Sequence, residues 1–154
     1  MEKIHAETSV FYLHGQAERV EWAGAPRILN GRRRGGNKMQ HFTWETVKKE
    51  VMNPKIWRKV ITGEKAMVAQ VFIAKGGVVP LHHHESEQLT YIIDGALQLT
   101  VEGKDVVVSS GEVLHIPSNV PHSAVALEDT LDLDIFSPIR KDWLTGQDDY
   151  LRKG

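Results

Sequence analysis

The sequence predicts an all-β fold, an antiparallel sandwich or barrel, and three observations lead to this prediction. The helical spacing of apolar residues disappears after Trp57. About nine short runs rich in β-forming residues follow at nearly regular spacing. Turn-forming sequences, most of them containing glycine, separate these runs. Many short strands without helices between them are typical of sandwiches and barrels.

Each run is bounded by residues that favour a chain reversal. The predicted strands are WRKVIT (57–62), AMVAQVFIA (66–74), VVPLHHH (78–84), QLTYII (88–93), ALQLTV (96–101), DVVVSS (105–110), VLHIP (113–117), HSAVALE (122–128) and LDLDIFS (131–137). The predicted turns are Thr62-Gly63-Glu64, Lys75-Gly76-Gly77, Asp94-Gly95, Glu102-Gly103-Lys104, Ser110-Gly111 and Glu128-Asp129. Glycine, aspartate and asparagine adopt the backbone conformations that such turns need.

Two helical segments are expected outside the strands. Before them, Thr43 can cap a short helix over WETVKKEVM (44–52), which Asn53-Pro54 would end. After them, KDWLTGQDDYLRKG (141–154) reads as a short helix or tail. Its apolar residues, Trp143, Leu144 and Leu151, would dock on the barrel.

Length and composition restrict the class of protein. A chain of 154 residues can bury a hydrophobic core in one domain. Its 19 basic and 20 acidic residues nearly balance, so no overall field attracts nucleic acid or an anionic membrane. Without cysteine, any metal must be held by nitrogen and oxygen. No signal peptide or membrane span is visible, and we expect a cytoplasmic protein.

Residues 1–38 differ in composition from the rest of the chain. They include GAPRILNGRRRGGNK, which lacks a clear period and is expected to be an N-terminal extension. The three arginines at 32–34 could contact a phosphate, but a solvated basic turn is the simpler interpretation. We expect the domain to span 39–154, and Met39 is an alternative start whose use mass spectrometry of the native protein would test.

The stretch PLHHHESEQLTYIIDG (80–95) holds candidate metal ligands. His82 and His84 lie two residues apart on a predicted strand, so they share a face, and two imidazoles at that spacing can close on one ion. A further ligand requires the chain to reverse, which Glu85-Ser86 allows. Strand parity leaves Glu87 and Gln88 as rivals for it, and a solvated histidine rim is the alternative to a metal site.

A second stretch, GEVLHIPSNVPHSAVA (111–126), favours the metal site. Together the two stretches resemble the paired motifs of the cupin superfamily. Gly76, His82, His84, Gln88 and Gly95 fall on the first motif, and Gly111, Pro117, Asn119, His122 and Ala126 on the second. Gln88 replaces an acidic ligand, Asn119 a glycine and Ala126 an asparagine. Asparagine tolerates the left-handed conformation that a turn glycine would supply.

The resemblance implies a cupin double-stranded β-helix, or jelly-roll barrel, at about 56–137, with a tail at 138–154. It also implies a metal held by His82, His84, Gln88 and His122. The ion would be a divalent transition metal such as Mn, Fe, Ni, Co or Zn. Because imidazoles and an amide are neutral, the full charge of a divalent ion would remain available to an anionic substrate.

The last predicted strand adds candidate catalytic residues. Its pattern alone favours burial of the aliphatic face formed by Leu131, Leu133 and Ile135, with the acids in water. However, HIPSNVPHSAVALEDTLDLDIFSPIRKDWL also resembles the small cupins of pectin and alginate breakdown, the KdgF type, over roughly 56–145. Those proteins convert 4,5-unsaturated uronates into open-chain keto sugars. The resemblance implies roles for Asp134 in proton transfer, Arg140 in binding the substrate and Phe136 in the pocket wall.

The expected function is therefore ring opening and ketonisation of a 4,5-unsaturated uronate by a metal-dependent isomerase. Since cupins support many reactions, a metal-dependent dioxygenase, another isomerase or a lyase is an alternative. So is a non-enzymatic cupin that binds a small ligand. The expected partners are a small anionic substrate and a second copy of the chain, joined through the face of Leu131, Leu133 and Ile135.

Overall fold

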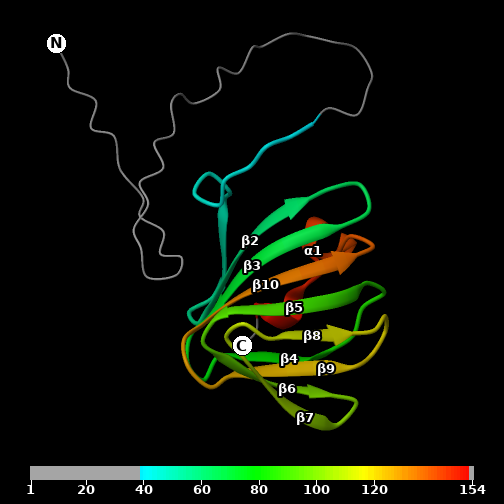
Figure 1. Cartoon of the computed structure of the whole chain (residues 1–154). Helices are drawn as coiled ribbons and strands as arrows, with labels where there is room; N and C mark the ends of the chain where they lie inside the picture. Colours follow the sequence, from blue (N-terminus) through cyan, green and yellow to red (C-terminus); the bar gives the residue numbers. More distant parts are fainter. Residues whose placement is uncertain (1–38, 153–154) are drawn as a thin grey trace, which may run out of the picture. The chain divides into compact units, whose positions relative to one another are not determined.

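The structure, a computed structural model, describes residues 39–152, which form two antiparallel sheets (Figure 1). One sheet has the order β1-β2-β3-β10-β5-β8 and the other β4-β9-β6-β7. The strands are β1 (Lys49–Asn53), β2 (Ile56–Thr62), β3 (Met67–Ile73), β4 (Val78–His82), β5 (Glu87–Asp94), β6 (Ala96–Val101), β7 (Lys104–Ser109), β8 (Val113–Ile116), β9 (His122–Ala126) and β10 (Thr130–Ser137). The predicted extension, residues 1–38, lies outside the described residues, and the alternative start at Met39 stays a prediction.

The nine predicted strands are confirmed, but the predicted helix at 44–52 is wrong. In its place the chain makes a turn, in which the Thr46 amide donates to the Thr43 carbonyl, and then enters β1. β1 pairs with β2, and Val51 lies opposite Trp57. A helix of nine residues is marginal by itself, whereas the free edge of β2 offers a full ladder of hydrogen bonds. Tertiary pairing therefore overrides the local pattern.

The core lies between the two sheets, where alternate residues of each strand point inward. In β5 the inward residues are Gln88, Thr90 and Ile92, and in β10 they are Asp132, Asp134 and Phe136. Leu131 and Leu133 are half-buried and Ile135 is exposed, so burial of the aliphatic face of β10, which the pattern alone favoured, is wrong. The polar face of β10 points inward, where Asp132 and Asp134 line a cavity together with apolar side chains of both sheets.

Two turn positions have the backbone that the sequence motifs require. Gly95 has φ +89, and a Cβ there would collide with the Asp129 carbonyl oxygen and the Thr130 side chain. Asn119 has φ 62, so it adopts the left-handed conformation expected of the residue that replaces the motif glycine. This turn places His122 at the start of β9.

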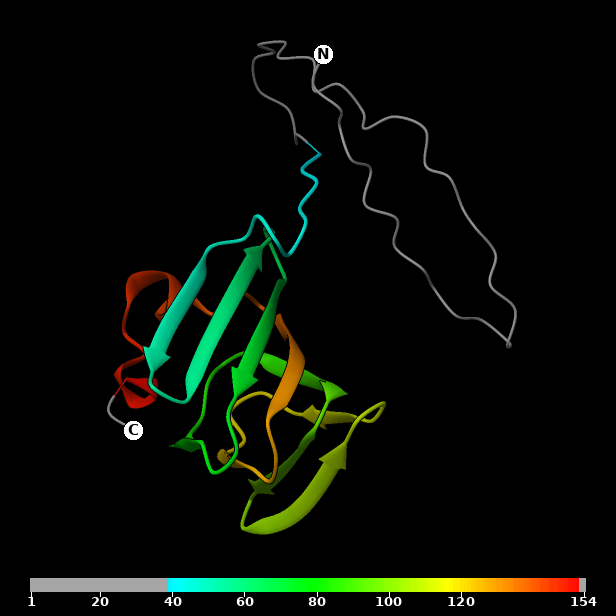
Figure 2. The same ribbon diagram turned by 90° about the vertical axis from the view of Figure 1, so that its left-hand side faces the viewer.

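The chain after β10 forms α1 (Lys141–Thr145) and a single 3-10 turn, η1 (Asp149–Leu151). Figure 2 shows this orange-to-red segment along one side of the barrel. Trp143 and Leu151 are buried, which confirms the predicted docking, whereas Leu144 is 54% exposed and does not dock. None of the helices in residues 39–152 is long and apolar enough to cross a membrane.

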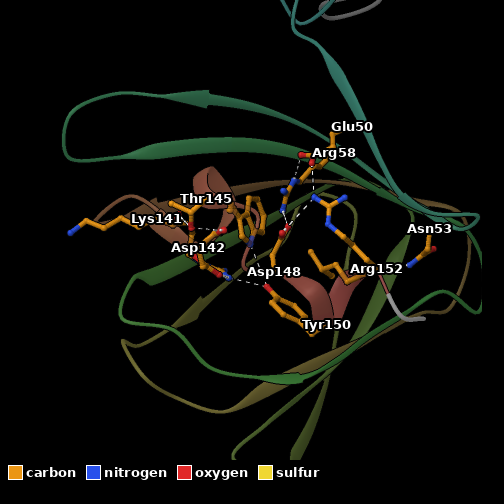
Figure 3. A network of polar contacts seen from close by, with 12 residues as sticks. Glu50, Asn53, Arg58, Lys141, Asp142, Thr145, Asp148, Tyr150 and Arg152 are labelled. Carbon is orange, nitrogen blue, oxygen red and sulfur yellow. Dashed lines mark hydrogen bonds and ion pairs between the residues drawn. The ribbon is translucent and has the colours of Figure 1, made fainter.

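Buried polar contacts fasten this C-terminal segment to the barrel (Figure 3). Arg58 of β2 is fully buried, and its Nη1 lies 2.6 Å from Oδ2 of the equally buried Asp148. The Arg58 guanidinium also lies over the Trp143 ring. The Asn53 side-chain amide donates to the Leu151 carbonyl at 2.8 Å. Because a buried charge without its partner is strongly destabilising, the Arg58–Asp148 pair holds the segment in one place.

Candidate metal centre and cavity

Three histidines from two strands meet at one end of the barrel. His82 ends β4, His84 follows it and His122 begins β9, directly opposite His82 in the strand register. One nitrogen of each ring lies within 4.8 Å of those of the other two rings. Between them His83 points outward and is exposed. The strand parity predicted for this stretch is therefore confirmed, and a third imidazole completes the cluster.

The backbone fixes which nitrogen each histidine turns toward the cluster. Nδ1 lies 2.8 Å from the Pro80 carbonyl in His82, from the Ser86 carbonyl in His84 and from the Val120 carbonyl in His122. A carbonyl oxygen only accepts, so each Nδ1 carries the proton and each neutral ring keeps a lone pair on Nε2. In His122, Nε2 is buried without a hydrogen-bond partner among residues 39–152. Three neutral imidazoles whose nitrogens lie this close together, one of them a buried Nε2 without a partner, fit a metal ion.

Burial keeps these rings neutral. It lowers the pKa of His82 from 6.5 to about 3 and that of His84 to about 4, with the other cluster histidines and Arg140 adding to the effect. Burial is also the main cause that lowers the pKa of His122. A neutral imidazole is the form that binds metal, so near neutral pH the three rings need no deprotonation to become ligands.

Gln88 extends this donor set from β5 in the other sheet. Its Oε1 lies 3.1 Å from Nε2 of His84. Because that nitrogen and that oxygen are both acceptors, the two atoms do not hydrogen-bond to each other. They stand at about the spacing of neighbouring ligands around an octahedral ion with bonds near 2.1 Å. Glu87 is exposed and pairs with His115 at 3.3 Å. Of the two candidate ligands, only Gln88 faces the cluster formed by the three histidines.

The amide of Gln88 links this centre to a buried carboxylate. Its Nε2 donates to Oδ1 of Asp134 at 2.9 Å and also lies 2.8 Å from the Thr90 hydroxyl. That hydroxyl donates to the same Asp134 oxygen at 2.6 Å. Burial raises the pKa of Asp134 from 3.8 to about 6, although both hydrogen bonds act to lower it. A carboxyl group that titrates near neutral pH in a cavity is suited to carry a proton.

Arg140 follows the cis Ser137-Pro138 peptide that ends β10 and is 2% exposed. Its Nε and Nη2 donate to the two Asp142 carboxylate oxygens at 2.9 and 2.6 Å. Nη2 also donates to the Tyr150 hydroxyl at 2.8 Å. The guanidinium lies 5.2 Å from the centroid of the Phe136 ring. One edge of the planar fork is thus held by Asp142, which fixes its orientation.

A cavity between the sheets brings the predicted residues together. His82, Gln88, His122, Asp134, Phe136 and Arg140 line it. His84 instead lines the adjoining surface hollow, which Arg140 also borders. Phe136 is buried and packs edge-on against His84 and Trp143. All seven residues predicted from the sequence therefore surround one region.

Three residues that sequence reasoning did not select also belong to this region. Thr90 shares the inward face of β5 with Gln88, and this parity was a signal that pointed to it. Tyr150 stacks on His82 with 4.4 Å between ring centroids, and it comes from the tail, whose position against the barrel no sequence pattern indicated. Asp132 lines the cavity two residues before Asp134, but the pattern placed both acids in water.

Comparison with known proteins decides the family. The model of the Cupin domain family matches residues 69–137. The chain is 32% identical over 98 residues to the pectin degradation protein KdgF of Dickeya dadantii (strain 3937), and the match spans 62% of this chain and 89% of KdgF. The chain belongs to the cupin family.

Solved structures agree with this assignment. The cupin superposes on KdgF from Halomonas sp. with a TM-score of 0.65 and 32% identity, over 69% of this chain and 99% of that one. An RmlC-like cupin from Shewanella frigidimarina NCIMB 400 gives a TM-score of 0.64 and 26% identity, over 68% of this chain and 96% of that one. The predicted jelly-roll fold and the predicted resemblance to KdgF are confirmed.

Proposed function

We propose that this cupin is a metal-dependent enzyme that opens and ketonises 4,5-unsaturated uronates. One observation carries the proposal: Gln88 turns its oxygen toward the three histidines and donates from its nitrogen to Asp134. A metal-binding donor set and a proton-carrying carboxylate thus share one amide. The name of the KdgF relative, a pectin degradation protein, supports uronates as the substrate class.

One divalent transition metal would be held by His82, His84, Gln88 and His122. When bound, it supplies a Lewis acid that stabilises negative charge developing on a substrate oxygen. All four donors are neutral, so they leave the ionic charge unreduced for an anionic substrate. Mn, Fe, Ni, Co and Zn all accept such nitrogen and oxygen donors, and elemental analysis of the untagged protein identifies the one present.

The proposed reaction is an isomerisation in which one proton changes place. The C1 hydroxyl loses its proton, the bond from C1 to the ring oxygen breaks as the aldehyde forms, and the ring oxygen keeps the electron pair. C4 of the resulting enolate then accepts a proton as C5 becomes a ketone. Asp134 is assigned as the base that takes the first proton, because it is buried beside the donor set and its pKa lies near neutral pH.

Arg140 is assigned as the anchor for the uronate carboxylate. Asp142 holds the edge formed by Nε and Nη2, which leaves the fork rigid, and the guanidinium lines the cavity. A planar guanidinium binds a carboxylate with a defined orientation. Phe136 is assigned as an apolar wall that packs under this guanidinium and beside His84.

The test follows unsaturated galacturonate and unsaturated mannuronate or guluronate monomers by NMR, with and without the protein. The proposal expects the open-chain keto product to form faster than it does spontaneously for at least one monomer. No acceleration for any of them overturns it. Two further results would favour the alternatives: turnover that requires dioxygen favours an oxygenase, and tight binding without product favours a ligand-binding cupin.

We also propose that a second copy of the chain covers the outer face of the six-stranded sheet. Leu89, Tyr91 and Ile93 of β5 are exposed there, and β10 places Ile135 opposite Leu89 and Leu133 opposite Tyr91. Such a contiguous apolar patch is unusual on a monomer. Sedimentation is expected to find a dimer that Tyr91→Asp converts to monomers, and a monomeric wild type would contradict this.

A further inference from the structure

Asp132 is a buried acid in the cavity with an oxygen that nothing satisfies. Asp132 is 2% exposed, and its Oδ1 has no hydrogen-bond partner within the described part of the chain. The side chain lines the cavity together with Asp134. Its neighbours across the strand ladder are Val71 in β3 and Ile92 in β5, which carry no side-chain donor. Among residues 39–152, no basic side chain forms an ion pair with this carboxyl group.

Such a group lowers the stability of the fold. A buried polar atom without a partner loses its hydration and gains nothing in return, and a buried carboxylate loses more. A valine or leucine at this position would instead add to the core. An unsatisfied buried group of this kind is expected where it acts on a ligand. Because the side chain lines the cavity, a molecule bound there can supply the partner that Oδ1 lacks.

We propose that Asp132 is a second catalytic acid, the group that delivers a proton to C4 of the substrate. The inference rests on the proposed ketonisation and assigns it a residue that the comparisons and the motifs do not. In this assignment Asp134 takes the proton from the C1 hydroxyl and Asp132 gives its own proton to C4.

The positions of the two reacting atoms favour two separate groups. C1 and C4 stand opposite each other in a six-membered ring, so a single fixed carboxyl group does not contact both the C1 hydroxyl and C4. Asp132 and Asp134 are alternate residues of one strand, and their side chains leave the same face about 6.6 Å apart. This spacing lets one carboxyl group meet each side of a bound ring.

The surroundings of the two acids suit opposite roles. Asp134 accepts hydrogen bonds from Thr90 and Gln88, which stabilise a negative charge. Asp132 has no such donor from a side chain. Burial, followed by the neighbouring Asp134 charge, raises the pKa of Asp132 well above its usual value, although a hydrogen bond from the Val71 backbone acts to lower it. Asp132 is thus the member of the pair that keeps its proton, as a general acid must.

The step balances without any co-reactant. Asp134 gains the proton that the C1 hydroxyl loses, and Asp132 loses the proton that C4 gains as the new C–H bond forms. The substrate and product have the same formula, and the reaction is neither an oxidation nor a reduction. A proton then returns from Asp134 to Asp132, directly or through water, and restores the starting state.

The test compares Asp132→Asn with wild type and with a matched control, Asp94→Asn, which removes an exposed carboxylate at the end of β5. Turnover of unsaturated galacturonate is followed by NMR in heavy water, at early times. Wild type is expected to place deuterium at one of the two C4 positions. Asp132→Asn is expected to lose about a hundredfold or more in rate and to label both positions, because the solvent then protonates the free enol. Asp94→Asn is expected to behave like wild type.

A stability measurement separates this role from a structural one. Asp132→Asn and Asp132→Val are expected to unfold at the same temperature as wild type or a higher one, since each removes the buried acid. Slower turnover in a protein that is no less stable supports catalysis. Wild-type rate and single-position labelling in Asp132→Asn overturn the inference alone. An inactive wild type overturns the inference and the proposed function together.

Discussion

Gln88 and Asp134 are joined by a hydrogen bond of 2.9 Å that runs from the amide nitrogen to the carboxylate. The other end of the same amide faces His84. A glutamate at this position would have no proton to donate to Asp134 while ionised, so glutamine is required for the link. The residue that departs from the usual cupin ligand is therefore also the one that connects the donor set to the proposed base.

Gln88→Glu is expected to keep a metal and lose turnover. The carboxylate remains a ligand, but it places a second negative charge beside Asp134 and removes a hydrogen bond that favours the ionised base. We expect a rate at least about a hundredfold lower, from steady-state kinetics, with unchanged metal content by elemental analysis. Glu87→Gln, on the exposed face of the same strand, serves as the control. Full activity in Gln88→Glu would show that the amide link has no role.

Asp134→Asn is expected to bind metal like wild type. Its turnover rate is expected to be lower by a factor of roughly 10² to 10⁴, the usual contribution of general acid–base catalysis. Asparagine has nearly the same shape as aspartate but does not take up a proton near neutral pH. Turnover and elemental analysis on the same preparation check both parts. An unchanged rate would remove Asp134 from the mechanism.

Arg140→Lys is expected to raise KM for the uronate by about tenfold to a hundredfold, with a smaller effect on kcat. A lysine ammonium lacks the planar guanidinium that Asp142 orients, and with it the donor nitrogen that is proposed to meet the substrate carboxylate. The magnitude corresponds to a loss of about 1.5 to 3 kcal/mol for hydrogen bonds to a charged group. Lys141→Gln, which changes an exposed neighbouring cation, is the control. If Arg140→Lys and Lys141→Gln have the same KM, Arg140 does not bind the substrate carboxylate.

The metal-free protein is expected to lose stability on acidification through its histidines. The folded state holds the pKa of His82 at about 3, below the ordinary 6.5. Between these values the unfolded chain binds more protons, so stability is fully present above pH 6.5 and falls as the pH drops toward 3. Asp134 acts in the opposite direction, because its pKa is raised to about 6.

A variant isolates the histidine contribution from that of the acids. We expect the stability of metal-free wild type, measured relative to His82→Gln by urea unfolding, to decrease from pH 7 to pH 4. A difference between the two proteins that is independent of pH would contradict a buried neutral His82.

Much of the barrel and of the site could be predicted from the sequence, because strands of this fold alternate regularly and its turns carry glycine. Strand parity left Gln88 and Glu87 as the two candidates for the fourth ligand. The motif spacing selected Gln88, the residue that faces the histidines. The left-handed backbone of Asn119 was likewise predictable from the residue that it replaces.

The remaining features depend on contacts between distant segments. β1 exists because the edge of β2 was available, which a local helical pattern over Trp44–Met52 does not reveal. Tyr150 reaches His82 from a tail that the Arg58–Asp148 pair helps to hold, and these two residues are 90 positions apart. The inward face of β10 was likewise misread by pattern alone, since Asp132 and Asp134 line a cavity at positions where an ordinary core would bury aliphatic side chains.

The most direct test of the account is metal-dependent turnover of unsaturated galacturonate, followed by NMR with untagged protein before chelation, after chelation and after reconstitution. A metal-dependent ketonising enzyme is expected to accelerate the spontaneous reaction, to lose this acceleration on chelation, and to regain it as one divalent metal per chain is restored. Equal rates with and without the metal, or no acceleration in any state, would contradict this expectation.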